Sequence, residues 1–579
     1  MKRLILAGLL IAATAASAAA QGGSASAVLA RLMTAAHERT ISNSITLQSR
    51  YGRPIERLPS VSLAAEEADA AFARALLDTL GTLDRNTLTP SERVSAETMD
   101  WVLGITANAA RYHWLSFSSI TPYQSPLMRE LLFLGRDMPL DTPEQRTRFL
   151  ARLGEIGPLT DSIRLGLEAR ATRGIRLNKA EAQQVIAALR SLRKPGLASP
   201  YAPSAARLAV DAGLGAAVAT TIDRTVDPAI GRLIDFLGGE YLARAPGAVG
   251  LKQYPGGEEY YRFLVAQNTT LDITPEAIHQ RGLDHLARLE HSMDSLLQVI
   301  GFKGTRKEFL AAMGKDPRFI AKTPEDVGAR YQKYYDAIKP LVGKLFSRTP
   351  KAPGEFRRLN PALEGSQTYG FYQAPSPASP VGIYFYNASN LATRSLFSVA
   401  NIAYHELVPG HHFQISLAHE NPDLPPFRQD FATNAYTEGW AEYASGLAGE
   451  LGLFADPYDL YGRLISEAFL TTRLVVDPGM NLLGWSREKA MAFMREHTMM
   501  AESEILSESL RYSVDLPGQA LGYKIGAFEF WRLRRKAEME LGSKFDVREF
   551  HALLLDAGSL PMKVVGAMVD RWIASRKQV

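Results

Sequence analysis

The chain has 579 residues, no cysteine, an apolar fraction of 46% and a formal net charge of +4. Its length and apolar content are sufficient for a large buried core. The net charge is too small to indicate a nucleic-acid-binding protein. The lack of cysteine excludes disulfides, thiolate metal sites and a lipid-accepting Cys within these residues, so any metal site must use His, Asp or Glu.

Residues 1–20 predict a secretory signal peptide. Lys2 and Arg3 precede a short apolar segment, which small residues follow. We expect cleavage near Ala18–Ala20. The alternative, an uncleaved membrane anchor, is disfavoured because the apolar run is short for a spanning helix. No later segment is long and apolar enough to span a bilayer. This pattern predicts a periplasmic or secreted protein without an integral membrane segment after cleavage, stabilised by its size rather than by crosslinks.

Residues 21–30 predict a linker, and helical patterns dominate from there to about residue 350. Apolar residues recur at helical spacing, and Thr89-Pro90 and Thr274-Pro275 are typical helix starts. The helices expected in this part are 64–80, one beginning at 89, 127–134, 143–153, 161–172, 179–192, 218–242, 275–298 and 323–344.

The composition changes at about Lys351, where Pro, Gly and Ser become frequent. Residues 381–387 then alternate in a β-prone pattern, which predicts a strand. The helices expected after it are 391–403, 431–451, 460–474, 487–499, 518–539 and 550–555. The elements together predict a mainly α fold with a small β-sheet near an active-site cleft. We expect one large domain at 31–579, with an N-terminal helical lobe at about 31–350 and a catalytic part at about 351–579.

The segment from Tyr404 to Phe413, with the sequence YHELVPGHHF, holds three of the eleven histidines. A zinc-peptidase helix commonly reads H-E-x-x-H, which places both histidines on one face. Here the residue four positions after His405 is Pro409. On a regular helix His411 would lie about 120° off the face of His405 and about 9 Å along the axis, so the two could not share a metal.

The Pro409-Gly410 pair predicts a break that resolves this geometry. A proline inside a helix clashes with the carbonyl four residues back, and a glycine tolerates unusual dihedral angles. A broken turn can therefore bring His411 back towards His405. We favour His411 over His412 as the second metal ligand. The alternative is that these are ordinary surface or hydrogen-bonded histidines.

Glu438 and Glu442 lie four residues apart, on one face of a predicted helix. One can bind a metal while the other orients a ligand histidine through its free ring nitrogen. The alternative is two solvated glutamates. Two histidines and a carboxylate leave an open coordination position for water, as catalytic zinc sites require, and Glu406 can then accept a proton from that water.

The string from His405 to Gln414 resembles the signature of the bacterial family DUF885. Other segments resemble further blocks of the family, and together they extend over roughly 30–575: 257–261, 274–276, 473–477, 484–488 and 516–520 with Tyr523 and Gly526. In the arrangement of its candidate metal ligands the family is similar to the gluzincin metallopeptidases, whose third ligand is a Glu in an N-E-G-F-A-like helix. The similar segment 437–441 implies that Glu438, rather than Glu442, is the third ligand. The resemblance also implies a large, two-lobed helical fold that encloses one zinc ion per chain and admits oligopeptides.

Several further residues are candidates for contacting the substrate. Tyr523, Tyr512 and Gln519 are candidate donors to an oxyanion, with Tyr523 preferred as a catalytic residue. Tyr384 and Tyr386 lie on the predicted strand, whose edge is expected to pair with an extended peptide. Arg394 is a candidate partner for a substrate carboxylate, with an exposed structural arginine as the alternative.

The hypothesis is an exported zinc-dependent peptidase that hydrolyses oligopeptides, with Glu406 as general base. One alternative is a zinc hydrolase of another amide or ester. A second, from a different class, is a catalytically silent, metal-stabilised binding protein of the envelope. Glu406 argues against the second, because a purely structural zinc site fills all four positions and needs no base.

Overall fold

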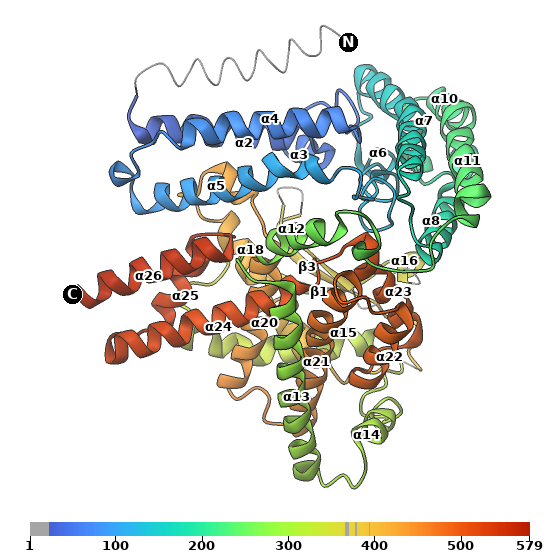
Figure 1. The fold of residues 1–579 in the computed structure, drawn as a ribbon. Helices are drawn as coiled ribbons and strands as arrows, with labels where there is room; N and C mark the ends of the chain where they lie inside the picture. Colours follow the sequence, from blue (N-terminus) through green and yellow to red (C-terminus); the bar gives the residue numbers. More distant parts are fainter. Residues whose placement is uncertain (1–22, 365–369, 377–378, 393, 579) are drawn as a thin grey trace. The chain divides into compact units, whose positions relative to one another are not determined.

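The computed structural model describes residues 23–364, 370–376, 379–392 and 394–578 (Figure 1). The predicted signal peptide at 1–20 lies outside these residues. The described chain is mainly helical with a small three-stranded sheet, which confirms the coarse fold class. None of its helices combines the length and the apolarity that crossing a bilayer requires.

The chain forms two compact units, of which unit 1 contains Met1–Tyr261 and Leu510–Pro517. The first helix of its described residues begins at Ala25, inside the range expected to be a linker, with Ser24 accepting a hydrogen bond from Ala27 N. The α-helices of unit 1 are α2 (Ala25–Ser42), α3 (Ile45–Arg50), α4 (Leu63–Leu80), α5 (Pro90–Ala109), α6 (Leu132–Asp137), α7 (Pro143–Thr172), α8 (Lys179–Leu192), α9 (Ala205–Leu208), α10 (Leu214–Thr221) and α11 (Asp227–Phe236). Helix α12 (Gly257–Thr269) crosses into unit 2.

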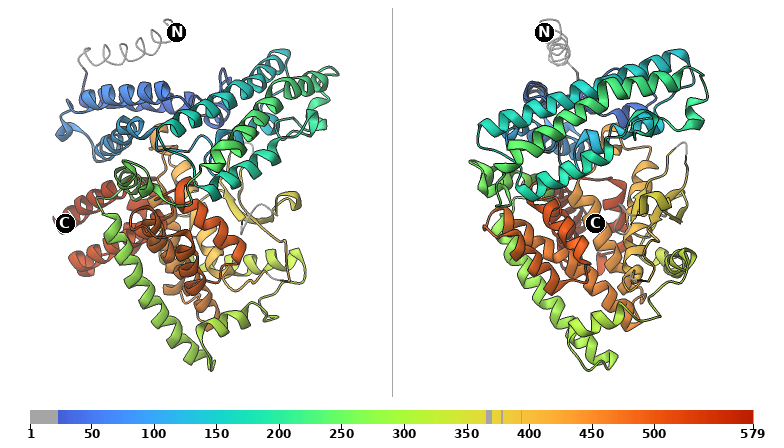
Figure 2. Two further views of the ribbon diagram at one scale, coloured as in Figure 1. Left: turned by 45° about the vertical axis from the view of Figure 1, so that its right-hand side comes forward. Right: turned by 90° about the vertical axis from the view of Figure 1, so that its right-hand side faces the viewer.

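One long helix, α7, replaces the two helices expected at 143–153 and 161–172. It continues through Pro158 because buried Ile156, Leu159 and Ile163 carry its apolar face across the proline. The apolar spacing therefore outweighs the helix-breaking tendency of proline here. In unit 1, α7 runs beside α11 (Figure 2).

Unit 2 contains Arg262–Ser509 and Gly518–Val579. Its α-helices are α13 (Pro275–Ile300), α14 (Arg306–Met313), α15 (Pro324–Ile338), α16 (Pro361–Glu364), α17 (Val399–Glu406), α18 (His411–His419), α19 (Pro426–Gln429), α20 (Asn434–Glu450), α21 (Pro457–Asn481), α22 (Arg487–His497), α23 (Glu502–Leu510, ending at the boundary), α24 (Leu521–Leu541), α25 (Val547–Asp556) and α26 (Met562–Gln578). Its strands are β1 (Gly354–Arg358), β2 (Gly370–Gln373) and β3 (Gly382–Tyr386).

The boundary between the units lies near residue 261, whereas the lobes were expected to divide near 350. The reason is that α13 packs along α21, so the two helices share one apolar core. Leu289 and Met293 of α13, Phe309 of α14 and Tyr461 of α21 all belong to that core. The helix expected at 391–403 begins only at Val399, and several helices, among them α26, were not predicted.

The sheet has the strand order β1-β3-β2, with β1 parallel and β2 antiparallel to β3. Strand β3, which corresponds to the predicted strand at 381–387, is therefore central. The expectation that its edge pairs with a substrate is wrong, because neighbouring strands already occupy both of its edges.

Helices α20 and α24 approach each other closely at glycines. A Cβ atom on Gly526 of α24 would overlap the carbonyl oxygen of Ala435 of α20. A Cβ atom on Gly439 of α20 would lie 2.6 Å from the Cα of Gly526. Because Gly439 and Gly526 have no side chains, α24 can come this close to α20, the helix that carries Glu438 and Glu442.

The substitution Gly526→Ala should destabilise the protein by about 1–3 kcal/mol, because the added methyl group overpacks this contact. Gly566→Ala in α26 is the matched control, since its Cβ would meet only Glu529 Oε1 at 4.0 Å. The control should be neutral or slightly stabilising. Urea unfolding followed by circular dichroism measures both variants, and equal stabilities would contradict the packing argument.

Candidate metal centre

The helical path breaks between His405 and His411, as the Pro409-Gly410 pair predicts. Helix α17 ends at Glu406 and α18 begins at His411. Gly410 has φ −80° and ψ −130°, and a Cβ there would overlap the carbonyl oxygen of His405. The indole Nε1 of Trp440 on α20 donates a hydrogen bond to Pro409 O at 3.0 Å, which holds the turn against α20.

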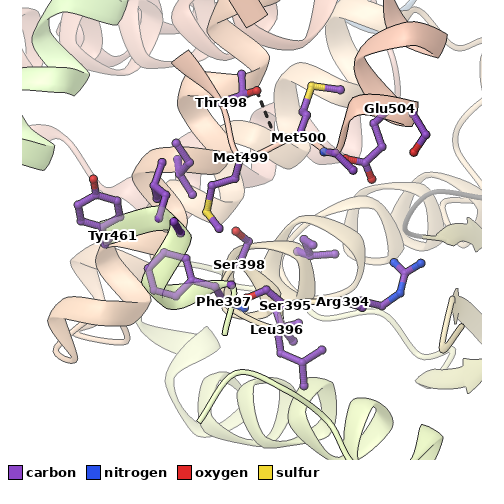
Figure 3. Close-up of a pocket in the computed structure, with 18 of the residues that line it drawn as sticks. Arg394, Ser395, Leu396, Phe397, Ser398, Tyr461, Thr498, Met499, Met500 and Glu504 are labelled. Atoms are coloured by element: carbon purple, nitrogen blue, oxygen red, sulfur yellow. Dashed lines mark hydrogen bonds between the residues drawn. The ribbon is translucent and has the colours of Figure 1, made fainter. Parts of the chain in front are cut away.

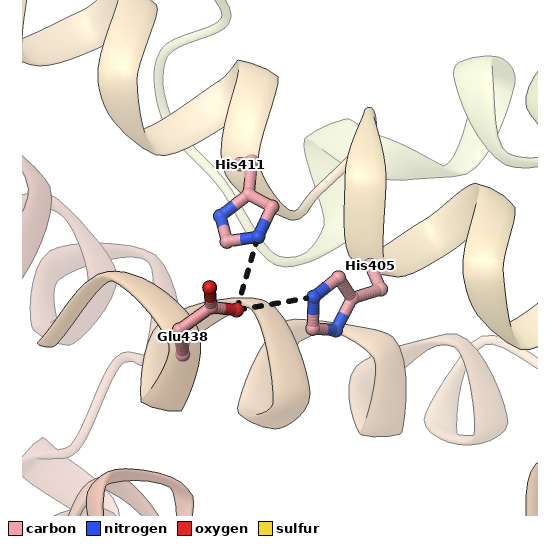
Figure 4. A group of neighbouring side chains, drawn as sticks. All are labelled: His405, His411 and Glu438. Atoms are coloured by element: carbon pink, nitrogen blue, oxygen red, sulfur yellow. Dashed lines mark ion pairs between the residues drawn. The ribbon is translucent and has the colours of Figure 1, made fainter. Parts of the chain in front are cut away.

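The break brings His405, His411 and Glu438 together from three helices (Figure 4). His405 Nε2 lies 3.4 Å from Glu438 Oε2, and His411 Nε2 lies 3.3 Å from the same oxygen. One ligand atom from each residue lies within 4.8 Å of the other two. The helix break thus produces the convergence that a regular helix excludes.

The spacing of this trio fits a divalent metal. Two ligand atoms bound to one zinc ion at about 2.0–2.1 Å with a tetrahedral angle lie about 3.3–3.4 Å apart. The nitrogen–oxygen distances of 3.4 and 3.3 Å match that value. They are longer than the roughly 2.7–2.9 Å of a direct charge-assisted hydrogen bond. Two imidazoles and one carboxylate are also a donor set that zinc accepts.

Glu442 lies behind the trio and orients His405. Its Oε1 lies 2.9 Å from His405 Nδ1, so the ring directs Nε2 at Glu438. Burial opposes the protonated form of His405, but hydrogen bonds to Glu438 and Glu442 outweigh it and hold the pKa well above its usual value. Burial likewise opposes ionised Glu438, yet the charge of His411 and the hydrogen bond from His405 hold the pKa of Glu438 well below its usual value. The Glu438 carboxylate is therefore ionised, and the groups around the trio favour a positive charge next to it.

Glu406 is outside the trio but within the electrostatic reach of its members. Burial raises the pKa of the Glu406 carboxyl, and the charges of His405 and His411 oppose that rise. The carboxyl group thus lies within electrostatic range of the two histidines and is not one of the three converging groups. This is the arrangement expected of a proton acceptor next to a metal.

The structure does not bring His412, the alternative ligand, into the trio. Its Nε2 lies 3.0 Å from Ala352 O, so Nε2 is the donating nitrogen. Its Nδ1 lies 3.0 Å from the Tyr372 hydroxyl and 3.3 Å from Ser416 Oγ. Burial lowers the pKa of His412, consistent with a neutral ring. Both nitrogens are occupied, so His412 supports the sheet rather than the trio.

Tyr523 of α24, the predicted catalytic tyrosine, lies against Arg473 of α21. The Cζ of Arg473 is 4.7 Å from the centroid of the Tyr523 ring, and Arg473 pairs with Glu508 at 3.1 Å. Burial lowers the pKa of Arg473, but the charges of Glu508, Tyr523 and Glu438 outweigh it and raise the value. A buried guanidinium thus lies over the ring of the predicted catalytic tyrosine and within electrostatic range of the predicted ligand Glu438.

The remaining candidates lie in different surroundings. Tyr384 and Tyr386 are buried on β3 against the ring of Tyr331, at centroid distances of 5.5 and 5.8 Å. Gln519 donates from Nε2 to Asn434 Oδ1 at the start of α20. Tyr512 is fully buried and belongs to unit 1, whereas the trio belongs to unit 2. Arg394 donates from Nε to Ser389 O and lines a pocket in unit 2.

Two residues near the centre had no role in the sequence-based prediction. One is Arg473, which lies in a segment that resembles the family but forms no recognisable motif. The other is Tyr372 on β2, whose ring is nearly parallel to that of His411 at 6.4 Å. Burial raises the pKa of Tyr372, and the charge of Glu406 adds to the effect. The alternation of β2 is too short to have identified this tyrosine.

Comparison with known proteins identifies the family. A family model described as "Bacterial protein of unknown function (DUF885)" matches residues 46–569, so the chain belongs to this family. No curated protein matches the chain.

Two solved structures are similar over nearly the whole chain. One, of a "putative lipoprotein" from Colwellia psychrerythraea, has 27% identity and a TM-score of 0.86, and the match covers 95% of this chain and 100% of that one. The other, of a "putative lipoprotein of unknown function" from Shewanella oneidensis, has 19% identity and a TM-score of 0.71, with 94% and 100% covered. The latter likeness concerns the fold alone.

Removing the Glu442 side chain tests the orientation of His405. Glu442→Ala should weaken zinc binding about 10- to 100-fold, because His405 loses the partner that directs its Nε2. Glu450→Ala at the far end of α20 is the control, since Glu450 pairs with Arg534. Competition with a chromophoric chelator measures both affinities. An unchanged affinity in a folded Glu442→Ala variant would contradict the assigned contact.

Proposed function

We propose that this protein is an exported zinc-dependent peptidase that hydrolyses oligopeptides. The observation that carries the proposal is the convergence of His405, His411 and Glu438. Glu406, the residue after His405, has its carboxyl group within electrostatic range of both histidines. Three protein ligands and a separate base are the elements of a hydrolytic metal centre, whereas a structural centre needs only ligands.

His405, His411 and Glu438 would hold one zinc ion. When bound, zinc acts as a Lewis acid that makes water a better nucleophile and polarises a carbonyl group. Glu442 keeps the His405 ring in register through the 2.9 Å contact at Nδ1. The donor set contains no thiolate, which also permits other divalent ions, and zinc is preferred for its affinity for imidazole.

The chain's own residues supply the proton transfers. The Glu406 carboxylate accepts a proton from the attacking water and delivers it to the leaving amine. The Tyr523 hydroxyl is the candidate donor to the developing oxyanion, with its ring held by Arg473 at 4.7 Å. Tyr372, against the His411 ring, is a second candidate donor on the side of the sheet.

The gluzincin-like description and the export belong to the same proposal. The Glu438 helix resembles the third-ligand helix of those peptidases, and the two-residue expansion between His405 and His411 is absorbed by the break at 407–410. The Colwellia protein is described as a "putative lipoprotein", which favours an envelope location for this chain as well. The 579 residues contain no cysteine to carry a lipid, so a cleaved signal peptide is the proposed route.

The substitution Glu406→Gln tests the role of Glu406 in turnover separately from zinc binding. The variant should retain zinc, because Glu406 is not in the trio, and should lose about 10²- to 10⁴-fold in kcat, because the amide cannot accept the proton. Digestion of a peptide library followed by mass spectrometry measures turnover, and elemental analysis measures zinc. A variant as active as the parent sinks the assignment of the base. A parent without stoichiometric zinc sinks the proposed function.

A pair of neighbouring variants identifies the second ligand. His411→Gln should reduce zinc affinity by more than the roughly 100-fold that is typical of changes behind the ligands. His412→Gln should keep zinc, because its ring nitrogens contact Ala352, Tyr372 and Ser416 instead. Calorimetric titration with zinc measures both, with circular dichroism as the check on folding. The reverse pattern would assign the metal to His412.

A further inference from the structure

Two features of unit 2 lie outside the trio. One is a pocket of about 800 Å³ lined by charged groups of both signs (Figure 3). Among the described residues, its lining includes neither Glu406 nor a member of the trio. The other is a hydrogen-bonded cluster of Tyr372, His412 and Ser416, here called the Tyr372 cluster. The ring of Tyr372 lies next to that of His411, so this cluster borders the candidate metal centre.

The imidazole of His412 is fixed in place by the sheet. A Cβ atom on Gly354 of β1 would lie 2.9 Å from His412 Cδ2, and a Cβ atom on Gly382 of β3 would overlap Nδ1. Two strands therefore approach the ring as closely as backbone can. The Nε2 atom lies 3.0 Å from Ala352 O, which adds a hydrogen bond to this packing. The ring thus cannot follow a partner that moves away from it.

His412 offers the cluster one acceptor atom. A carbonyl oxygen such as Ala352 O can only accept, so Nε2 carries the proton and Nδ1 has the free lone pair. The Tyr372 hydroxyl lies 3.0 Å from Nδ1, and Ser416 Oγ lies 3.3 Å from it. One lone pair accepts one hydrogen bond of good geometry. The two hydroxyl groups therefore compete for Nδ1, and the shorter distance makes Tyr372 the donor in this structure.

Ser416 can replace Tyr372 as the donor. Both hydroxyl groups are within reach of Nδ1, and Ser416 is buried. Burial raises the pKa of Tyr372, and a hydrogen bond with Ser416 opposes that rise, so the two hydroxyl groups are also close to each other. A buried acceptor left without a donor is costly. The Tyr372 hydroxyl can therefore turn away from His412 at low cost only because Ser416 is there to donate instead.

We propose that Tyr372 donates a hydrogen bond to the oxyanion of the substrate, and that His412 and Ser416 are positioning residues that hold and then release its hydroxyl. In the resting protein Tyr372 donates to His412 Nδ1, and in the reacting complex Ser416 takes its place there. The inference rests on the proposed function and adds to it how the donor is controlled. The Tyr372 ring lies next to that of His411, and its phenol is within electrostatic range of Glu406.

A double-mutant cycle on the zinc-loaded protein tests the exchange of donors. Tyr372→Phe should lower kcat about 10²- to 10³-fold, with little change in KM, because a donor to the oxyanion is lost. Ser416→Ala should lower kcat about 5- to 150-fold, because releasing Tyr372 would leave Nδ1 without a donor. In the Tyr372→Phe background Ser416→Ala should have no further effect on kcat, since no hydroxyl remains to be released.

The control for the cycle is Ser466→Ala, whose Oγ donates to Gly462 O at 2.9 Å within α21. It should leave kcat unchanged. If Ser416→Ala lowers kcat equally in both backgrounds, its role is only structural and the inference is overturned, while the peptidase assignment stands. If the parent cleaves no peptide at all, the proposed function fails and the donation to the substrate fails with it.

A second measurement does not depend on turnover. Nitrogen NMR of isotope-labelled histidines in the zinc-free protein reports whether His412 Nδ1 accepts a hydrogen bond, and His412→Gln identifies the signal. The signal should be nearly unchanged in Tyr372→Phe, because Ser416 then donates to Nδ1, and should shift when Ser416→Ala is added. A shift in Tyr372→Phe alone that is as large as in the double variant would show that Ser416 does not replace Tyr372, and would overturn the inference.

Discussion

The break between α17 and α18 is the constraint on which the candidate centre depends. His405 is the penultimate residue of α17 and His411 the first residue of α18, so their rings meet only because the chain turns at 407–410. Gly410 permits the backbone to pass the His405 carbonyl, and Trp440 fixes the turn from α20. The helix that fixes the turn also carries Glu438, two residues before Trp440. The turn at 407–410 and its contact with α20 therefore align all three converging groups.

Buried charge is the second determinant of the site. Glu438, Glu442 and Glu508 are shielded from solvent, and each has a cationic or ionisable partner: His405 and His411 for Glu438, His405 for Glu442 and Arg473 for Glu508. Leaving one such group without its partner costs several kcal/mol, roughly 3–5 for a buried pair. This cost favours a single arrangement of the helices that carry these groups, and preorganisation of this kind is what a catalytic centre requires.

The sequence predicted those parts of the molecule that depend on local chemistry. The Pro-Gly pair predicted the break, and the Glu438–Glu442 spacing predicted two carboxylates on one helical face. The helical character of most segments followed from apolar spacing. The contribution of β2 could not be predicted, because four residues in a Pro- and Gly-rich segment carry too little alternation, and Tyr372 was missed with it. The central position of β3 was also beyond reach, since strand order is set by long-range pairing.

Arg473 shows a different limit of prediction from the sequence. Its position four residues before Asp477 on α21 gives no sign of its interactions, because its relation to Glu438 and Tyr523 arises from the packing of separate helices. The boundary between the units could not be predicted for the same reason. The contact between α13 and α21 joins residues almost 200 positions apart, and no local change in composition marks it. Charged groups that act across helices are therefore found by structure rather than by motif.

Both ends of α17 are fixed to other helices of unit 2. At its entry, Gly462 of α21 lets the carbonyl of Phe397 lie where a Cβ would otherwise be. At its exit, Trp440 of α20 holds Pro409. The first turn of α17 lines the pocket and its last turn carries His405 and Glu406, so a helix of eight residues sets the distance between the two. Because a shift of either end would break one of these close contacts, α21 and α20 together fix the position of α17, and with it that of His405 and Glu406.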